Sequence, residues 1–368
     1  MRILHITHTD VTNDSRIEKE IDALSSLPDS VIFCYFVVSG AYCKDRLRDD
    51  VMYLESHSIA NRYLWINRSL RHIIKIIELS FDIIFKGLKV KADIVHVHDT
   101  LALPAATFLA AISGSKLIYD AHELESDKNG QSRFMSLGTY VLERLCWWKI
   151  NGFVTVSDSI RDWYFQRFPS KQCQVILNSP SFYPPTQSIL RSVLGISRNS
   201  LVVIYIGYLS KGRGIESALE AYSNLEINSD LVFLGSGDLE SLIDSYASKY
   251  SNIHRHPPVA HDKVVEFASG ADVGLCVIEN VSQSDYLCLP NKLFEYAFSG
   301  LRVIGSDFPE ISSVLRQFDL GITVDGSPRS IQEAVEKIPI KSTTSSEHLY
   351  PLSWNYQVKK LLDLYERL

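Results

Sequence analysis

The chain has 368 residues, of which 46% are hydrophobic and 22% are charged. This length exceeds what one hydrophobic core usually supports, and no tract is polar or repetitive enough to remain disordered, so we expect two folded domains. The formal net charge of −6 excludes a general electrostatic attraction to nucleic acid or anionic lipid and leaves such contacts to a local basic patch.

Cysteine usage and the start of the chain bear on its location. The 6 cysteines are scattered without a CxxC pair, which is typical of a protein from a reducing cytoplasm. Residues Met1–Thr9 are too short and too polar for a signal peptide, and no uncharged run reaches the length of a membrane span. We therefore expect a cytoplasmic protein, either soluble or bound at the inner face of the cell membrane.

In the first half of the chain, short runs rich in β-branched residues alternate with helical stretches, which is typical of a parallel sheet covered by helices on both faces. The predicted strands are Arg2–Thr7, Val31–Val37, Ile94–His98, Lys116–Asp120, Gly152–Val156 and Gln174–Leu177. The proline-rich stretch Asn178–Ser188 then predicts an exposed connection between domains.

The second half repeats this architecture. Its predicted strands are Leu201–Gly207, Leu231–Gly235, Ala271–Val277, Leu301–Gly305 and Gly321–Val324. Apolar residues at helical spacing in Ser353–Leu368 predict a terminal helix. We expect two Rossmann-like α/β domains with doubly wound parallel sheets facing a cleft, over residues 1–180 and 181–350, and a helix over 351–368 that packs back on the first domain.

Two glycine-containing loops follow predicted strands, where ligands bind in doubly wound sheets. The sequence IYIGYLSKGRGI includes Gly207 and Gly212, which let a ligand approach the backbone, and Arg213, which can neutralise a phosphate. The same residues are compatible with an ordinary turn whose basic side chains are solvated. LVFLGSGD has Gly235 and Gly237 in a similar position, although a lone GxG is weak support for a ligand site.

The segment LPNKLFEYAFSGLRVIGSDFPE, Leu289–Glu310, is the most specific feature of the chain. It predicts a helix that has Lys292 and Glu295 in its first turn and that ends at Gly300. Lys292 can bind a phosphate near the helix N-terminus, and Glu295 can accept hydrogen bonds from sugar or ribose hydroxyls. The alternative is an amphipathic helix with a salt-bridged surface.

Histidines and carboxylates follow two strands of the first domain. His96 and His98 share one face of a strand by the two-residue period, and His122 and Glu123 follow the next strand. Together with Asp99 they could hold a metal ion, but imidazoles equally suit sugar hydroxyls and hydrogen bonds between strands. Because the chain has no Asp-x-Asp motif, we expect no metal and assign phosphate neutralisation to Arg213, Lys292 and helix termini.

The opening strand and turn lack the GxGxxG of a dinucleotide fold, which argues against a nicotinamide enzyme, and they present Asp14 and Arg16 before an amphipathic helix. Further along, Asn61–Lys91 is rich in Arg and Lys interleaved with Trp65, Ile and Leu. Such a helix can lie on an anionic membrane surface, or it can pack against the core with a solvated basic face.

These motifs resemble those of the retaining glycosyltransferases of the GT-B fold, in particular family 4, the glycosyl transferases group 1. The resemblance rests on PNKLFEYAFSG, on the IGYLSKGRG loop and on VTVSDSI followed by VILNSP, and it covers nearly the whole chain. It implies a nucleotide-sugar donor, transfer with retention of anomeric configuration and no metal. Protein contributions would then be mainly positioning and charge stabilisation.

By this resemblance, Arg213 and Lys292 hold the donor diphosphate, Glu295 binds the ribose and His122 touches the transferred sugar. The nucleotide pocket is expected to include Gly207, Gly212, Gly235, Gly237, Leu289 and Asn291. On the acceptor side, the first domain is expected to contribute Asp14, Arg16, His98 and Glu123.

Two departures from the family pattern matter. The acid often found eight residues before Glu295 is Leu287 here, and the basic residue usual after the first glycine is Tyr208. Contacts to the donor sugar would then come from the backbone of Leu287–Asn291 or from Asp285. The departures keep open a catalytically degenerate scaffold subunit as an alternative.

The sequence thus predicts transfer of a sugar from a UDP- or GDP-linked donor to a glycan or lipid-linked acceptor. Bacterial cell-surface polysaccharide or lipopolysaccharide synthesis is the expected setting, with peripheral membrane contact through residues 61–91 and no nucleic-acid partner. A nucleotide-sugar 2-epimerase of the same fold, using the carboxylates and histidines as acid and base, is the second enzymatic alternative.

Overall fold

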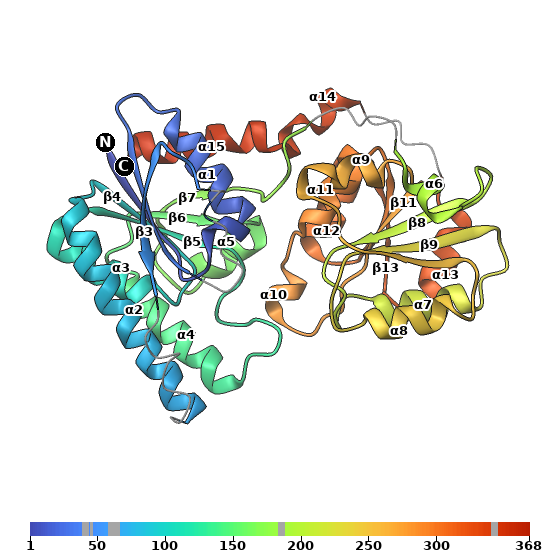
Figure 1. Cartoon of the computed structure of the whole chain (residues 1–368), viewed down its shortest axis with the longest axis horizontal. Helices are drawn as coiled ribbons and strands as arrows, with labels where there is room; N and C mark the ends of the chain where they lie inside the picture. Colours follow the sequence, from blue (N-terminus) through green and yellow to red (C-terminus); the bar gives the residue numbers. More distant parts are fainter. Residues whose placement is uncertain (39–43, 45–46, 58–66, 183–187, 340–344) are drawn as a thin grey trace. The chain divides into compact units, whose positions relative to one another are not determined.

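The computed structural model describes residues 1–38, 44, 47–57, 67–182, 188–339 and 345–368. They form two compact units, Met1–Ile176 with Val358–Leu368, and Leu177–Gln357 (Figure 1). The second unit thus begins a few residues before the expected position 181. The terminal helix α15 (Trp354–Arg367) starts in the second unit, and its part from Val358 onward belongs to the first.

The first unit contains a parallel sheet in the order β3-β2-β1-β4-β5-β6-β7. Its strands are β1 (Arg2–Ile6), β2 (Val31–Val37), β3 (Val51–Ser56), β4 (Ile94–His98), β5 (Lys116–Ala121), β6 (Gly152–Thr155) and β7 (Gln172–Val175). The helices are α1 (Ser15–Ser25), α2 (Arg68–Val90), α3 (Leu103–Ser113), α4 (Arg133–Cys146) and α5 (Asp158–Phe165), with a 3₁₀ turn at Val11–Asn13. Edge strand β3 was not predicted, and β7 begins and ends two residues earlier than predicted.

The second unit contains a parallel sheet in the order β10-β9-β8-β11-β12-β13. Its strands are β8 (Leu201–Ile206), β9 (Ser229–Leu234), β10 (Ile253–His256), β11 (Val273–Cys276), β12 (Arg302–Ser306) and β13 (Gly321–Val324). The helices are α6 (Leu190–Leu194), α7 (Ile215–Ser223), α8 (Glu240–Ala247), α9 (Val264–Ala268), α10 (Gln283–Tyr286), α11 (Asn291–Phe298), α12 (Pro309–Gln317), α13 (Pro328–Lys337) and α14 (Ser346–Leu349). Edge strand β10 was not predicted.

Both faces of the second sheet are covered. Along β8, Val202 and Ile204 pack into one hydrophobic cluster, whereas Val203 and Tyr205 pack into another on the opposite face. Burial on both faces explains why this strand is a continuous apolar run rather than an alternating one. The prediction of two doubly wound parallel-sheet α/β domains is therefore confirmed.

The order in which successive strands are added to the sheet reverses between β1 and β4 in the first unit and between β8 and β11 in the second, although all of these strands are parallel. At such reversals the connecting loops diverge and leave a crevice at the carboxyl ends of the strands. Among the described residues, no helix has the length and apolarity needed to cross a bilayer. The predicted membrane segment begins at Asn61, and residues 61–66 lie outside the described residues.

Candidate functional site

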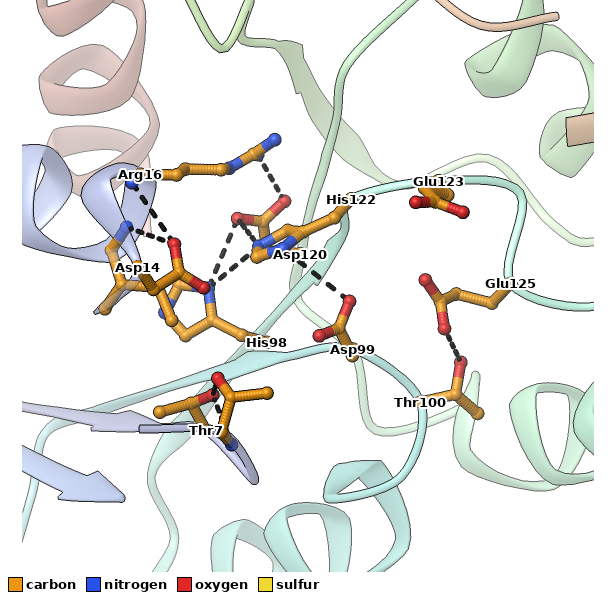
Figure 2. Close-up of polar contacts among 12 residues, drawn as sticks. Thr7, Asp14, Arg16, His98, Asp99, Thr100, Asp120, His122, Glu123 and Glu125 are labelled. Carbon is orange, nitrogen blue, oxygen red and sulfur yellow. Dashed lines mark hydrogen bonds and ion pairs between the residues drawn. The ribbon is translucent and has the colours of Figure 1, made fainter. Parts of the chain in front are cut away.

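In the first unit, neighbouring strands bring histidines together at their carboxyl ends (Figure 2). His5 Nδ1 of β1 lies 3.0 Å from His98 Nε2 of β4, and His98 Nδ1 lies 3.2 Å from Nε2 of His122, which follows β5. His96 stacks on His98, as expected for residues on one face, with 4.5 Å between the ring centroids, and it also contacts the hydroxyl of Tyr365 on α15 at 2.7 Å. The chain of rings His5–His98–His122 thus leads from the buried sheet to a partly exposed imidazole.

A buried ion-pair network holds this chain of rings in place. Asp120 at the end of β5 contacts His122 Nε2 at 3.1 Å, and its other oxygen contacts the Arg16 guanidinium at 2.6 Å. Arg16 also donates to Glu20 at 3.0 Å, and Asp120 and Glu20 have no solvent exposure. Because a buried charge is tolerated only when it is paired, each group of this network depends on the others.

The network sets the charge of His122. Burial is the largest single effect on this imidazole and disfavours its charged form, but Asp120 and Asp99 together outweigh it and raise the pKa of His122 to about 9. Burial also disfavours the charged form of Asp120 and by itself would raise the pKa of this carboxyl group. Arg16 and His122 nevertheless hold the pKa of Asp120 well below its usual value. His122 is therefore an imidazolium at neutral pH. Its side chain, 18% exposed, can donate hydrogen bonds to a hydroxyl or stabilise a negative charge.

The other predicted acceptor-side residues have separate roles in this unit. Asp14 caps helix α1, accepting hydrogen bonds from the backbone N–H groups of Arg16 and Ile17. Arg16 is only 3% exposed, and its guanidinium is held by the two carboxylates of the network. Glu123 is 56% exposed and points away from the histidines, with Lys128 4.0 Å away (Figure 2). The structure thus brings His98 and His122 together but leaves Glu123 outside the cluster.

The metal alternative can be compared with this arrangement. Within the described part of the chain, one group of possible ligands is His5, Glu20, His96 and His98, and another is His98, Asp120 and His122. Neither includes Asp99 or Glu123, which the sequence had suggested. The Arg16 guanidinium already bonds the carboxylates of both groups, so it supplies the positive charge that a cation would bring.

A cavity of about 510 Å³ lies in the first unit, with His8 in its lining. It is bounded by the ends of β2 and β3, by helix α2 and by His8, and its polar lining includes Glu55, Lys75 and Glu78. His8 Nδ1 lies 3.9 Å from Asp99, whose other oxygen lies 3.6 Å from His122. Asp99 thus lies within ion-pair distance both of His8, which lines the cavity, and of His122, which does not.

A second buried network lies beneath the loop that follows His122. Glu143 of α4 accepts hydrogen bonds from the hydroxyls of Tyr119 and Tyr164, and Glu125 is held by Lys128 at 2.8 Å. Burial raises the pKa of Glu143 and of Glu125 to about 7, in the latter case with a further contribution from Asp99. These carboxyl groups therefore change protonation near neutral pH.

In the second unit, the predicted glycines pack two loops together. A Cβ atom on Gly235 would lie 1.9 Å from the carbonyl oxygen of Gly207, and one on Gly237 would lie 2.6 Å from that of Leu209. Only glycine permits this approach. Gly212 adopts a φ of 80°, which favours glycine in the loop before α7. The packing of these two loops therefore explains why glycine occupies these positions, whether or not a ligand binds nearby.

Lys292 lies in the first turn of α11, as predicted, whereas Glu295 lies one turn further along and is 7% exposed. The Lys292 ammonium is buried 3.7 Å from the centroid of the Tyr205 ring, and it has no hydrogen-bond partner among the described residues. The N-cap residue Pro290 provides no side-chain cap for α11. A buried cation without an anion beside an uncapped helix N-terminus favours binding of a negatively charged ligand.

Arg213 lies in the same region as Lys292. Burial raises the pKa of the Cys276 thiol to about 11, and both Lys292 and Arg213 act against this shift, so both cations lie within electrostatic range of one thiol at the end of β11. Asp285 on α10 contacts Arg213 at 3.4 Å and accepts a hydrogen bond from Ser282 at 2.7 Å. Asp285 therefore orients the guanidinium, a role that the sequence did not suggest.

The remaining predicted residues flank these cations. Leu289 is buried, and Asn291 is exposed at the first position of α11. Leu287, which replaces the family's usual acid, is 7% exposed, and Tyr208 is 61% exposed with its hydroxyl 3.4 Å from Asp238. Both departures from the family pattern leave Arg213 and Lys292 in place.

Comparison with known proteins adds to this geometry. Residues 200–339, most of the second unit, match the family described as Glycosyl transferases group 1. No curated protein sequence matches the chain.

Solved structures match the whole chain. Sucrose-phosphate synthase from Thermosynechococcus elongatus has a TM-score of 0.78 at 14% identity, covering 100% of this chain and 98% of its own. Anabaena Alr3699/HepE in complex with UDP-glucose has 0.70 at 13%, covering 100% and 98%. The lipopolysaccharide outer core galactosyltransferase WaaB in its apo form has 0.67 at 15%, covering 100% of both chains. At such identities the likeness establishes the fold alone, and this chain has the GT-B fold.

Proposed function

We propose that this protein is a glycosyltransferase that takes a sugar from a nucleotide-sugar donor bound to the second unit. The observation that carries the proposal is the Lys292 ammonium, buried without a partner at the uncapped start of α11. A donor diphosphate is the anion that this position lacks. The family match over residues 200–339 and the UDP-glucose complex of the Anabaena protein support this choice of ligand.

On the donor side, Lys292 and Arg213 bind the diphosphate, and Glu295 accepts hydrogen bonds from the ribose hydroxyls. The loops at Gly207–Gly212 and Gly235–Gly237, with Leu289 and Asn291, line the nucleotide pocket. We assign the contact to the transferred sugar to His122, because its imidazolium is a fixed hydrogen-bond donor. UDP and GDP remain the two candidate nucleotides.

We further propose that transfer proceeds with retention and without a metal ion. As the bond between the sugar and the diphosphate breaks, negative charge grows on the leaving oxygen, and Lys292 and Arg213 stabilise it. The acceptor hydroxyl forms the new glycosidic bond on the face that the leaving group vacates. Its proton passes to the leaving phosphate oxygen, so no additional base is required.

The acceptor is a glycan or a lipid-linked sugar, and the cavity of the first unit is its proposed site. Its mixture of carboxylates, lysines and apolar side chains suits the hydroxyls and ring faces of sugars. His8 and Asp99 connect the cavity to His122. Cell-surface polysaccharide or lipopolysaccharide synthesis, at the cytoplasmic face of the membrane with contact through residues 61–91, remains the proposed setting.

Incubation of the purified protein with UDP- and GDP-sugars and a panel of glycan acceptors tests this function. We expect release of the nucleoside diphosphate together with a new glycoside whose anomeric configuration matches that of the donor, read by NMR. Release of a free, altered sugar without an acceptor would support the 2-epimerase instead. Neither hydrolysis nor transfer with any donor would support the degenerate scaffold, although the unpartnered Lys292 argues against it.

A further inference from the structure

Two strands and one helix of the first unit bring three polar side chains together in the interior. His5 of β1 and His96 of β4 stand opposite each other in the register of these parallel strands, with 4.9 Å between their ring centroids. Glu20 lies on α1, and its Oε2 atom is 3.9 Å from His96 Nε2. None of the three side chains has any solvent exposure. We call these three residues the His5–Glu20–His96 cluster.

One polar atom of each residue in the cluster is left without a partner. His5 Nε2, His96 Nε2 and Glu20 Oε2 have no hydrogen-bond partner among the described residues. Glu20 and His96 do not satisfy each other, because 3.9 Å is too long for a hydrogen bond. Buried polar groups nearly always have a partner, so three unpaired atoms in one cluster indicate that the cluster binds a ligand.

The spacing of the cluster suits a metal ion. One nitrogen or oxygen atom from each of His5, Glu20, His96 and His98 lies within 4.8 Å of those of the others. Two ligands of one zinc ion, each about 2.1 Å from it, lie about 3.4 Å apart in a tetrahedral site and at most about 4.2 Å apart. The distance of 3.9 Å between Glu20 and His96 falls in this range. His98 is not available as a ligand, because its two nitrogens lie 3.0 Å from His5 Nδ1 and 3.2 Å from His122 Nε2.

The second polar atom of each residue in the cluster is held by a neighbour. These contacts join His5 Nδ1 to His98 at 3.0 Å, His96 Nδ1 to the Tyr365 hydroxyl at 2.7 Å, and Glu20 Oε1 to Arg16 at 3.0 Å. A histidine that binds a metal normally uses one ring nitrogen for the ion and donates its other N–H to a neighbouring group, and a metal-binding carboxylate is likewise hydrogen-bonded. All three residues of the cluster have this arrangement.

We propose that His5 Nε2, His96 Nε2 and Glu20 Oε2 bind a Zn²⁺ ion. Two imidazoles and one carboxylate favour a transition-metal ion over Mg²⁺ or Ca²⁺, which prefer oxygen ligands. Arg16 balances the carboxylate charge, so charge alone does not call for a cation here. The two imidazole nitrogens do, because a guanidinium that bonds the carboxylates leaves them unsatisfied.

The ion at this site is structural. Its ligands have no solvent exposure, so it contacts neither a sugar nor a diphosphate, and the inference is independent of the proposed function. It joins β1, β4 and α1 to one another. It also fixes His5 against His98, through which the chain of rings reaches His122. Zinc therefore stabilises the first unit and leaves the metal-free transfer proposed above unchanged.

Metal analysis of the full chain tests the proposal. The protein is produced in minimal medium with either ZnCl₂ or only MgCl₂ added and is purified without a metal-affinity step. We expect about one zinc ion per chain by mass spectrometry after growth with zinc. The melting temperature of this protein should be at least about 5 °C above that of the protein grown without zinc.

Variants separate this site from adventitious zinc. His96→Asn removes Nε2 but keeps an amide that can contact the Tyr365 hydroxyl, so it should fold and retain at most about one tenth of the zinc. The matched control His348→Gln removes an exposed imidazole of the second unit and should bind zinc as wild type does. Tyr365→Phe, which removes the partner of His96, should lower zinc affinity by about 10–100-fold.

X-ray absorption at the zinc edge identifies the ligands without any variant. We expect nitrogen and oxygen at about 2.0–2.2 Å, with scattering from imidazole rings and no sulfur at about 2.3 Å. Sulfur ligands would overturn the proposal and place the zinc at cysteines. Wild-type protein without zinc, or a folded His96→Asn protein with the zinc content of wild type, would overturn it as well.

Discussion

The charged residues at the carboxyl ends of the two sheets differ in how they are neutralised. In the first unit, Arg16, Asp120 and His122 pair with one another, so the charges are balanced within the protein. In the second unit, Lys292 is buried over the Tyr205 ring and has no hydrogen-bond partner among the described residues. The comparison separates a site organised by its own ion pairs from one that is incomplete without an anion. Variants should therefore affect stability in the first case and ligand binding in the second.

The largest expected effect is on stability, from Asp120→Asn. Removing this carboxylate leaves the Arg16 guanidinium partly unpaired in the interior, which costs about 3–5 kcal/mol in the free energy of unfolding. Urea denaturation measures this loss. Arg329→Gln, which breaks an exposed pair with Glu333, is the control and should leave the free energy of unfolding unchanged. An Asp120→Asn protein as stable as wild type would show that Asp120 is not needed to balance the charges of Arg16 and His122.

Lys292→Met should have the opposite pattern. We expect kcat/KM to fall by an amount equivalent to about 2–5 kcal/mol, as does the loss of a desolvated charge on a transition-state phosphate. Stability should be unchanged or slightly higher, because the variant removes an unpaired buried charge and its thioether can still pack on Tyr205. Kinetics would check the expected fall in kcat/KM, and melting curves would check the expected stability. Both are measured on Lys292→Met and on the exposed control Lys249→Met. A destabilised Lys292→Met protein would mean that this ammonium has a structural partner.

The glutamate network beneath the His122 loop predicts a pH dependence of smaller size. The pKa of Glu143 is raised to about 7 in the folded state, so its contribution to stability is full below its unfolded value near 4.5 and is lost as pH rises through about 7. Glu143→Gln should lack this loss and be more stable than wild type by about 1–3 kcal/mol at pH 8. Unfolding free energies at pH 5 and pH 8 test this, and an identical pH dependence in both proteins would contradict it.

His122 gives a pH profile of the same sign in a higher pH window. Its pKa is raised to about 9, so the stability from its charged form is full below the unfolded value near 6.5 and is lost as pH rises through about 9. The difference in unfolding free energy between wild type and His122→Gln should therefore shrink between pH 6.5 and pH 9.5. A constant difference over that range would show that His122 is already neutral at pH 6.5.

The smallest expected effect concerns Asp285, which orients a partly exposed Arg213. Asp285→Asn should raise the donor KM by an amount equivalent to about 0.5–1 kcal/mol and leave kcat nearly unchanged, because solvent screens this pair. Initial-rate kinetics over a range of donor concentrations would measure it. A larger fall in kcat than rise in KM would place Asp285 against the reacting sugar instead.

The central strands of both units could be predicted because they are continuous apolar runs, as strands buried on both faces must be. Edge strands β3 and β10 could not. The sequence of β10 is IHRH, which has no apolar run, and β3 has only the short run VMYL before Glu55 and Ser56, so neither has the long apolar signal on which the prediction relied. Edge strands tolerate polar residues because one side remains open to solvent.

The sites differ in the same way. The helix that begins near Lys292 could be predicted from local spacing, including its end at Gly300, which has a φ of 76°. The Arg16–Asp120 pair joins residues 104 positions apart, and no local pattern announces such a partner. Arg16 was accordingly assigned to the acceptor side. The sequence analysis did not predict that His5 joins His98 and His122. The alternation of side chains in β1 was the available signal, because it places His5 on the same face as Thr7, which directly follows the strand.

Equilibrium binding of nucleotide tests the central claim, that Lys292 awaits a diphosphate, most directly. Calorimetry would compare the tighter binder of UDP and GDP with its own nucleoside, on wild type, Lys292→Met and Lys249→Met. We predict that the diphosphate binds wild type and Lys249→Met alike, at least about tenfold tighter than the nucleoside does, and that Lys292→Met loses about thirtyfold in diphosphate affinity, equivalent to about 2 kcal/mol. Diphosphate binding of wild-type strength to a folded Lys292→Met protein would contradict the account.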